Sequence, residues 1–197
     1  DLSRKGGAIR VYNTASVDWL DFSEITFTIT GCTFKNLKAD YGGALYLSPQ
    51  TKGTVKNCSF IQNTANKRGG AIYLDSNGVL VDDCVFNSNS AEDDGGAIYV
   101  EARHNSIKNS VFVNNKAKDE GGAFYINARD TSIAFSAFFS NSAKKGQDIY
   151  CDSSSCELYN SIILGNSPKE AIYSTNQFSA ARNWWGNVES NRNVQPD

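Results

Sequence analysis

The sequence repeats itself with a period of about 26 residues, and this periodicity constrains the fold more than any other feature. Its most visible element is a motif of two glycines, an alanine and three residues typical of strands. Clear copies begin at Gly69, Gly95 and Gly121, and fainter ones at Gly6 and Gly42. Internal repeats of about 20–50 residues are the signature of solenoids and propellers. The 197 residues are therefore predicted to form one elongated domain, 1–197.

Two further columns keep the same period. One is a phenylalanine followed three residues later by an asparagine: Phe60 and Asn63, Phe86 and Asn89, Phe112 and Asn115, Phe138 and Asn141. The other is aliphatic: Ile29, Val55, Val81, Ile107, Ile133 and Leu158. Three columns in phase indicate that equivalent residues of successive repeats lie next to one another.

Each period contains short runs of β-branched and aromatic residues separated by Gly, Asn, Asp and Ser. The period that begins at Gly69 predicts strands at 71–74, 79–81 and 84–86, followed by a loop at 87–94. It is too short for a four-stranded propeller blade and carries no helical pattern. We therefore predict an all-β fold, a right-handed parallel β-helix (a solenoid) of about seven coils of about 26 residues.

In such a stack, each column becomes a ladder along the solenoid axis. Ile72, Ile98, Phe124 and Ile149 are predicted to lie inside, as are the phenylalanines. The asparagines are expected to pass hydrogen bonds from coil to coil. The glycine pairs are expected where the backbone takes positive φ or approaches its neighbour closely. The column Ala65, Ala91, Ala117 and Ala143 predicts another crowded position.

The two ends of the chain depart from the repeat. We expect an irregular first coil and loop at 1–24, regular coils at 25–175 and a C-terminal cap at 176–197 that contains Asn183-Trp184-Trp185-Gly186. Since the chain has no methionine and opens within a motif, it is expected to be a piece of a longer protein. Any anchoring to a membrane or cell wall would then depend on parts of that parent chain outside this sequence.

The five cysteines fall into two groups. Cys32, Cys58 and Cys84 share a column that continues with serines at 110, 136 and 161, which predicts buried small side chains; no histidine joins them to form a metal site. Cys151 and Cys156 bracket a four-residue turn, and the sequence leaves open whether a disulfide joins them. That bond would favour an extracellular location.

Charged residues precede the glycine pairs, with Lys67 and Arg68, then Asp93 and Asp94, then Asp119 and Glu120, then Lys144 and Lys145. Two interpretations are open. The four acids, Asp93, Asp94, Asp119 and Glu120, could bind calcium through oxygen ligands. A solvated ladder of ion pairs is favoured instead, because the flanking Lys and Arg neutralise the acids.

A column of tyrosines alternates with the inward Ile or Leu, and we expect it to point outward: Tyr46, Tyr73, Tyr99, Tyr125, Tyr150 and Tyr173. Stacked tyrosines on a flat face could form a platform for a sugar or a protein partner. The alternative is that a β-sheet simply favours aromatic cross-strand neighbours.

Composition excludes several function classes. A net charge of −2 gives no reason to expect nucleic-acid binding. No apolar run approaches the roughly 18 residues that could span a bilayer. The single histidine, His104, lies in a predicted turn, and no paired-acid motif stands out. We therefore expect no catalysis and no cofactor, and a monomer.

Repeated Gly-Gly-Ala-(Ile/Leu/Phe) and Phe-x-x-Asn motifs over about residues 6 to 175 resemble the repeats of chlamydial polymorphic outer membrane proteins. Together with Asn183-Trp184-Trp185-Gly186, the chain looks still more like the adhesin-like β-helix proteins of methanogenic archaea. The pattern slips at Phe34, with Asn36 only two residues later, and Ile163 replaces phenylalanine before Asn166. The resemblance implies surface display and attachment to another cell or to host material; it identifies no receptor.

Three functions follow as hypotheses. The leading one is a non-enzymatic, extracellular adhesin module that binds a surface protein or glycan of another cell, for which a rigid solenoid face is well suited. The second is a structural stalk that spaces a distal domain from the cell. The third is a polysaccharide-active β-helix enzyme, which would require a groove with converging acids.

Overall fold

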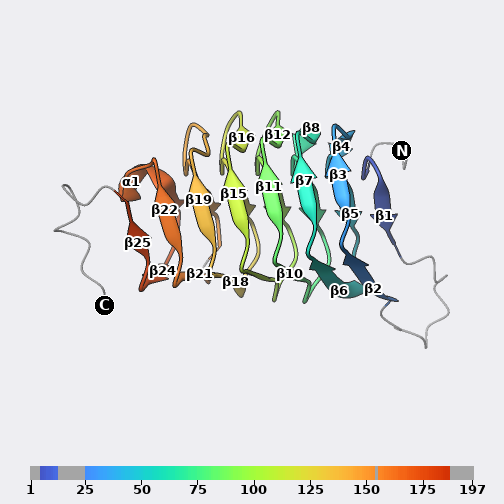
Figure 1. Cartoon of the computed structure of the whole chain (residues 1–197). Helices are drawn as coiled ribbons and strands as arrows, with labels where there is room; N and C mark the ends of the chain where they lie inside the picture. Colours follow the sequence, from blue (N-terminus) through green and yellow to red (C-terminus); the bar gives the residue numbers. More distant parts are fainter. Residues whose placement is uncertain (1–4, 13–24, 154, 187–197) are drawn as a thin grey trace.

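The computed structural model describes residues 5–12, 25–153 and 155–186. The chain winds into coils, and the strands of each coil pair in parallel with the equivalent strands of the neighbouring coils (Figure 1). Three seven-stranded sheets and one four-stranded sheet form the walls of the solenoid. The predicted all-β parallel β-helix is therefore confirmed, with about six complete turns of about 26 residues.

The first sheet follows the glycine motifs. It pairs Ile72 with Ile98, Ile98 with Phe124 and Phe124 with Ile149, so the predicted inner ladder is confirmed. All four of these side chains are fully buried. Its strands are β1 (Ile9–Val11), β5 (Leu45–Leu47), β9 (Ile72–Leu74), β13 (Ile98–Val100), β17 (Phe124–Ile126), β20 (Ile149–Cys151) and β23 (Ile172–Ser174).

The second sheet contains the aliphatic column. Val81 pairs with Val55 on one side and Ile107 on the other, and all three are buried. Its strands are β2 (Ile25–Thr30), β6 (Thr51–Lys56), β10 (Leu80–Asp82), β14 (Ser106–Lys108), β18 (Thr131–Ala134), β21 (Cys156–Tyr159) and β24 (Phe178–Ala181).

The third sheet contains the phenylalanine column. The ring of Phe86 stacks on Phe60 at 4.7 Å and on Phe112 at 4.8 Å between centroids, inside the core. Its strands are β3 (Thr33–Lys35), β7 (Ser59–Ile61), β11 (Val85–Asn87), β15 (Val111–Val113), β19 (Ala137–Phe139), β22 (Ile162–Leu164) and β25 (Trp184–Trp185).

A fourth, short sheet occupies the segment predicted as a loop, and this corrects the prediction. Ala91 pairs with Ala65 and Ala117, and the three methyl groups are buried. A two-residue strand such as Ser90–Ala91 has no β-branched or aromatic residue to reveal it. Its strands are β4 (Lys38–Tyr41), β8 (Thr64–Arg68), β12 (Ser90–Ala91) and β16 (Lys116–Ala117), and the short helix α1 (Pro168–Ala171) precedes β23 in the last coils.

The buried asparagines connect the coils as expected. The Asn89 amide Nδ2 donates to Asn115 Oδ1 at 3.0 Å and to the carbonyl of Phe60 at 3.0 Å, while Asn89 Oδ1 accepts from Asn63 Nδ2 at 2.9 Å. The series ends where Asn141 Nδ2 donates to the buried carboxylate of Asp148 at 2.8 Å. One corner of each coil from Asn63 to Asn141 is thus tied to the next coil.

The two glycines of each pair have different roles. Gly95 has φ of 66°, a left-handed conformation that disfavours other residues. Gly96 has no room for a side chain, since a Cβ there would overlap the carbonyl oxygen of Gly122 in the next coil. Both roles foreseen from the sequence are therefore present, each on a different glycine.

The regular coils extend beyond the expected boundaries. Strand β1 belongs to the first sheet although it lies within 1–24, and β24 and β25 continue the second and third sheets past residue 175. Trp185 packs against the core, whereas the side chain of Trp184 is 54% exposed. The predicted loop at 13–24 and the end of the predicted cap at 187–197 lie outside the described residues.

Candidate functional site

The six predicted tyrosines form a continuous stack, called here the tyrosine ladder, on the first sheet. Successive rings of Tyr46, Tyr73, Tyr99, Tyr125, Tyr150 and Tyr173 stack with centroids 4.9 to 5.2 Å apart. Tyr46, Tyr73 and Tyr99 belong to a cluster separate from the main core, so the rings lie outside the coil interior, as expected.

The ladder is not the flat, open platform that the sequence suggested. Tyr46, Tyr73, Tyr99 and Tyr150 expose 8% or less of their surface, and only Tyr173, the last ring, reaches 41%. Because each ring stacks on the next, the neighbouring rings cover its faces. The parts of these tyrosines that can reach a ligand are the ring edges and the hydroxyl groups.

An acid row borders the ladder on one side; it consists of Asp75, Glu101 and Asp152, each two residues after a ladder tyrosine. The tyrosines donate to it diagonally, from one coil to the next. Tyr46 donates to Asp75 at 2.8 Å, Tyr73 to Glu101 at 3.3 Å and Tyr125 to Asp152 at 3.4 Å. This row was not predicted from the sequence, although its constant offset of two residues from the tyrosines could have revealed it.

A flanking row borders the ladder on the other side and consists of the residues just before the glycine pairs. Three of its cations lie over tyrosine rings: Lys5 Nζ is 4.5 Å from the Tyr46 centroid, Arg68 Cζ 5.0 Å from Tyr99 and Lys145 Nζ 5.5 Å from Tyr173. The members of the row are Lys5, Tyr41, Arg68, Asp94, Glu120 and Lys145.

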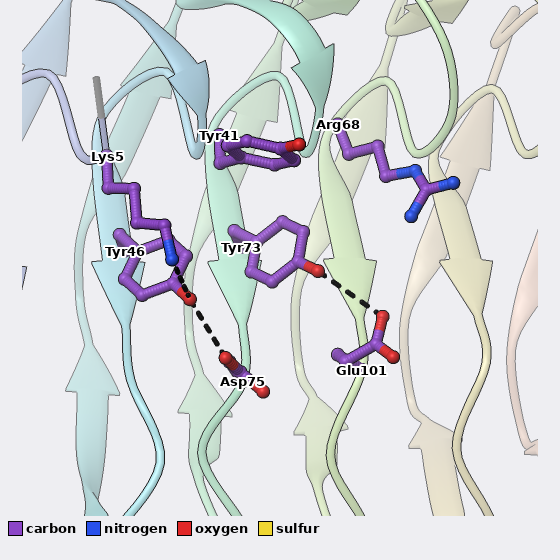
Figure 2. Close-up of a pocket in the computed structure, with 7 residues that line it drawn as sticks. All are labelled: Lys5, Tyr41, Tyr46, Arg68, Tyr73, Asp75 and Glu101. Carbon is purple, nitrogen blue, oxygen red and sulfur yellow. Dashed lines mark hydrogen bonds between the residues drawn. The ribbon is translucent and has the colours of Figure 1, made fainter. Parts of the chain in front are cut away.

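A cavity of about 440 Å³ lies between the two rows. Figure 2 shows Lys5 and Arg68 on one side of the rings and Asp75 and Glu101 on the other. Its lining is Lys5, Tyr41, Tyr46, Arg68, Tyr73, Asp75 and Glu101. The site therefore offers cationic donors, phenol hydroxyls and carboxylate acceptors within one groove.

Burial is the main cause of the pKa shifts of Tyr73 and Asp75 in this groove. It raises the pKa of Tyr73 well above its usual value, and the nearby charges of Glu101 and Asp75 act in the same direction. The hydroxyl therefore stays protonated and remains a donor. Burial also raises the pKa of Asp75, with Glu101 adding to it and the hydrogen bond from Tyr46 opposing it.

The four calcium candidates, Asp93, Asp94, Asp119 and Glu120, are brought to adjacent coils, where three of them form ion pairs with cations. Arg68 Nε lies 3.3 Å from Asp94, Lys144 pairs with Asp119, and Lys145 lies 2.9 Å from Glu120. Across the described residues, no group of three or more potential ligands is arranged to hold a metal ion. The ion-pair interpretation is the one the structure supports.

The side chain of Asp94 is less exposed than those of Asp119 and Glu120. Burial raises its pKa to about 6, with the charges of Glu120, Asp93 and Asp119 adding to the effect and Arg68 opposing it. Ionisation of this carboxyl is therefore sensitive to pH in the mildly acidic range.

The cysteines follow the two predicted groups. Cys151 and Cys156 form a disulfide that closes the short turn, with Cα atoms 6.6 Å apart. Cys58 and Cys84 are buried free thiols, and Cys32 is partly exposed at the start of their column. Burial raises the pKa of Cys84 to about 12, so the thiol stays protonated and unreactive.

The structure also places the residues considered for catalysis. His104 is exposed and lies 3.5 Å from Asp130, as expected for a histidine in a turn. Asp75 and Glu101, by contrast, converge in the groove from adjacent coils, and this pair was not predicted from the sequence. No helix in the described part of the chain is long and apolar enough to cross a membrane.

Comparison with known proteins agrees with this architecture. A family model described as "Right handed beta helix region" matches residues 2–163. No curated protein and no solved structure gives a significant match. Because the family match covers well over half of the 197 residues, the chain belongs to the right-handed beta helix family.

Proposed function

We propose that this chain is a non-enzymatic adhesin module, displayed outside the cell, whose groove along the tyrosine ladder binds a glycan or surface protein of another cell. The observation that carries the proposal is the cavity in which Lys5 and Arg68 face Asp75 and Glu101 across tyrosine hydroxyls. This cavity is polar and concave and lies on a rigid scaffold, so it suits recognition of a hydroxyl-rich ligand.

Two further features support an extracellular adhesin. The Cys151–Cys156 disulfide is typical of oxidising compartments outside the cytoplasm. The Gly-Gly-Ala and Phe-x-x-Asn repeats resemble those of chlamydial polymorphic outer membrane proteins and of archaeal adhesin-like proteins. Because a stacked ladder exposes edges and hydroxyls, we propose that hydrogen bonding contributes more to this recognition than stacking of sugar rings.

The groove is tested by measuring binding of the purified chain to a glycan array and to intact candidate cells. The variant Asp75→Asn with Glu101→Gln keeps the side-chain shapes and removes both charges. The matched control, Glu92→Gln with Glu157→Gln, removes two exposed charges elsewhere. Tyrosine truncation is avoided because these rings are too buried to be removed without unfolding.

We expect saturable binding by the parent chain that weakens about tenfold or more in the groove variant, since charge-assisted hydrogen bonds are lost. The control should bind within about twofold of the parent. If the parent binds nothing, the proposal is wrong and a structural stalk becomes the better account. If both variants lose binding equally, the groove is not the site.

One observation favours a second candidate, a polysaccharide-active enzyme. Asp75 and Glu101 lie on adjacent coils of one cavity, and paired carboxylates are the catalytic groups of many glycoside hydrolases. Release of reducing ends from polysaccharides bound on the array, abolished by Glu101→Gln alone, would establish this candidate in place of the adhesin.

A further inference from the structure

A second cavity of about 350 Å³ lies beside the turns that leave the first sheet. Arg103 and Arg129 occupy equivalent positions of adjacent coils there, and the N–H of His104 donates to the carbonyl of Arg129 at 3.4 Å. The cavity is lined by Glu101, Arg103, Asn127, Ala128, Arg129, Asp152, Ser153 and Asn176. It shares Glu101 with the first cavity, so the two adjoin.

The carboxylates of this cavity already have partners. Glu101 accepts from Asn127 Nδ2 at 3.2 Å in addition to the tyrosine ladder. Asp152 accepts from Thr175 Oγ1 at 2.7 Å in addition to Tyr125. Their remaining capacity to hold a cation is therefore reduced.

The two arginines differ from these acids. Both are exposed, and neither forms an ion pair with a carboxylate in the part of the chain that the structure describes. Asp130, the acid of the same turn, pairs with His104 at 3.5 Å and accepts from Ser155 Oγ at 3.1 Å. The guanidinium donors are thus the charged groups of this cavity that are available to a ligand.

A buried hydroxyl lines the same cavity. Ser153 is 5% exposed, and its Oγ has no hydrogen-bond partner among the described residues. It lies two residues after Cys151, which forms a disulfide with Cys156. Buried polar groups normally find partners, and a ligand or water oxygen in this cavity could provide one.

The arrangement favours one ligand chemistry. A guanidinium binds an oxyanion through two parallel N–H donors. The two oxygens of a carboxylate can accept such a pair of hydrogen bonds from only one guanidinium. Equivalent residues of adjacent coils are about 4.8 Å apart, so a group with three terminal oxygens can bridge both arginines. We propose that Arg103 and Arg129 bind a sulfate or phosphate ester carried by a glycan.

This inference rests on the proposed function only in taking the carrier of the ester to be a glycan. A glycan in the tyrosine groove would continue past Glu101 and place its ester group between the two arginines. Specificity for charged over neutral glycans would then come from the second cavity.

The test measures binding of the whole chain to dextran sulfate, dextran phosphate, carboxymethyl dextran and unmodified dextran at one ionic strength. Variants are Arg103→Gln, Arg129→Gln and the double variant. The matched control is Lys35→Gln with Lys38→Gln, which removes two exposed charges from β3 and β4. Circular dichroism and thermal unfolding establish that each variant is folded.

We expect the parent to bind dextran sulfate or dextran phosphate saturably and carboxymethyl dextran more weakly. Each single arginine variant should bind about tenfold more weakly, and the double variant more weakly still. Which of the two esters binds more tightly identifies the natural group. The lysine control should remain within about twofold of the parent, because exposed charges on other sheets are screened.

Three results would overturn the inference: equal losses in the arginine and lysine variants, equal affinity for carboxymethyl dextran, or no saturable binding by the parent. If inorganic sulfate binds as tightly as dextran sulfate, the part of the inference that assigns the ester group to a glycan is wrong. Failure of the tyrosine groove is recognised separately with Asp75→Asn alone, because Asp75 lines the first cavity and not the second, and this variant would then leave binding of array glycans unchanged.

Discussion

The hydroxyl of Tyr46 donates a 2.8 Å hydrogen bond to Asp75, a residue of the following coil. Lys5, from the preceding coil, donates to the same hydroxyl at 3.0 Å. One phenol therefore connects three successive coils across the floor of the groove. The tyrosine ladder thus positions the charged groups of the candidate site as well as stabilising the sheet.

Changing Tyr46 to Phe should destabilise the chain by about 1–2 kcal/mol, because the half-buried Asp75 loses a hydrogen bond while the ring still stacks on Tyr73. Urea unfolding followed by circular dichroism measures the change. Tyr173→Phe is the control, since Tyr173 is 41% exposed and its hydroxyl bonds to no described residue. An equal effect of both substitutions would show that the Tyr46 hydroxyl is unimportant.

Changing Gly96 to Ala should destabilise the fold by about 3 kcal/mol or more, because the new Cβ overlaps the carbonyl of Gly122 and separates two coils. Gly31→Ala is the comparison: it has φ of 65° but no atom within 4 Å of a Cβ, so only the backbone penalty of about 1–2 kcal/mol applies. Thermal and urea unfolding of both variants give the difference. A smaller loss at Gly96 than at Gly31 contradicts the close approach of the coils.

Changing Asn89 to Ala should cost about 3–5 kcal/mol, because the backbone N–H of Asn63 loses its buried acceptor and the side-chain amide no longer donates to the Phe60 carbonyl and to Asn115 Oδ1. Asn77→Ala removes an exposed hydrogen bond to the Arg103 N–H and should cost less than about 1 kcal/mol. Unfolding free energies of the two variants test this. Similar losses would mean that the ladder of asparagines adds little to stability.

Stability should fall with rising pH through the titration of Asp148. Burial raises its pKa from 3.8 to about 6, although Asn166 and Asn141 both donate to it. Between about pH 4 and pH 6 the folded chain holds a proton on Asp148 that the unfolded chain has released. The contribution of Asp148 to the free energy of unfolding is therefore fully present below about pH 4 and is lost above about pH 6. The loss amounts to about 3 kcal/mol.

The measurement is the free energy of unfolding at pH 4 and pH 7 for the parent and for Asp148→Asn. In Asp148→Asn, the free energy of unfolding should fall less between pH 4 and pH 7 than in the parent, by most of the decrease assigned to Asp148. Asp94→Asn is a useful comparison, since burial raises that pKa to about 6 as well. An unchanged difference between the two pH values in Asp148→Asn would show that Asp148 ionises normally in the fold.

Much of the core could be read from the repeat. The strand positions near Ile72 and Phe86, the inward ladders and the role of Asn89 follow from a constant spacing, because each coil returns to the same corner after nearly the same number of residues. The fourth sheet could not be predicted from the sequence. Ser90–Ala91 is a strand only because its backbone pairs with the backbone of the two neighbouring coils.

The sequence by itself determined the solenoid, its period and which residues stack along its axis, since stacking follows directly from periodicity. Only the tertiary structure decided how far the tyrosines are buried and that Tyr46 meets Asp75, 29 residues away and off the main period. It also decided that Arg103 and Arg129 share a cavity with Ser153. These contacts run sideways between columns, and their geometry depends on the width of each turn and the lean of each side chain, which no repeat length specifies.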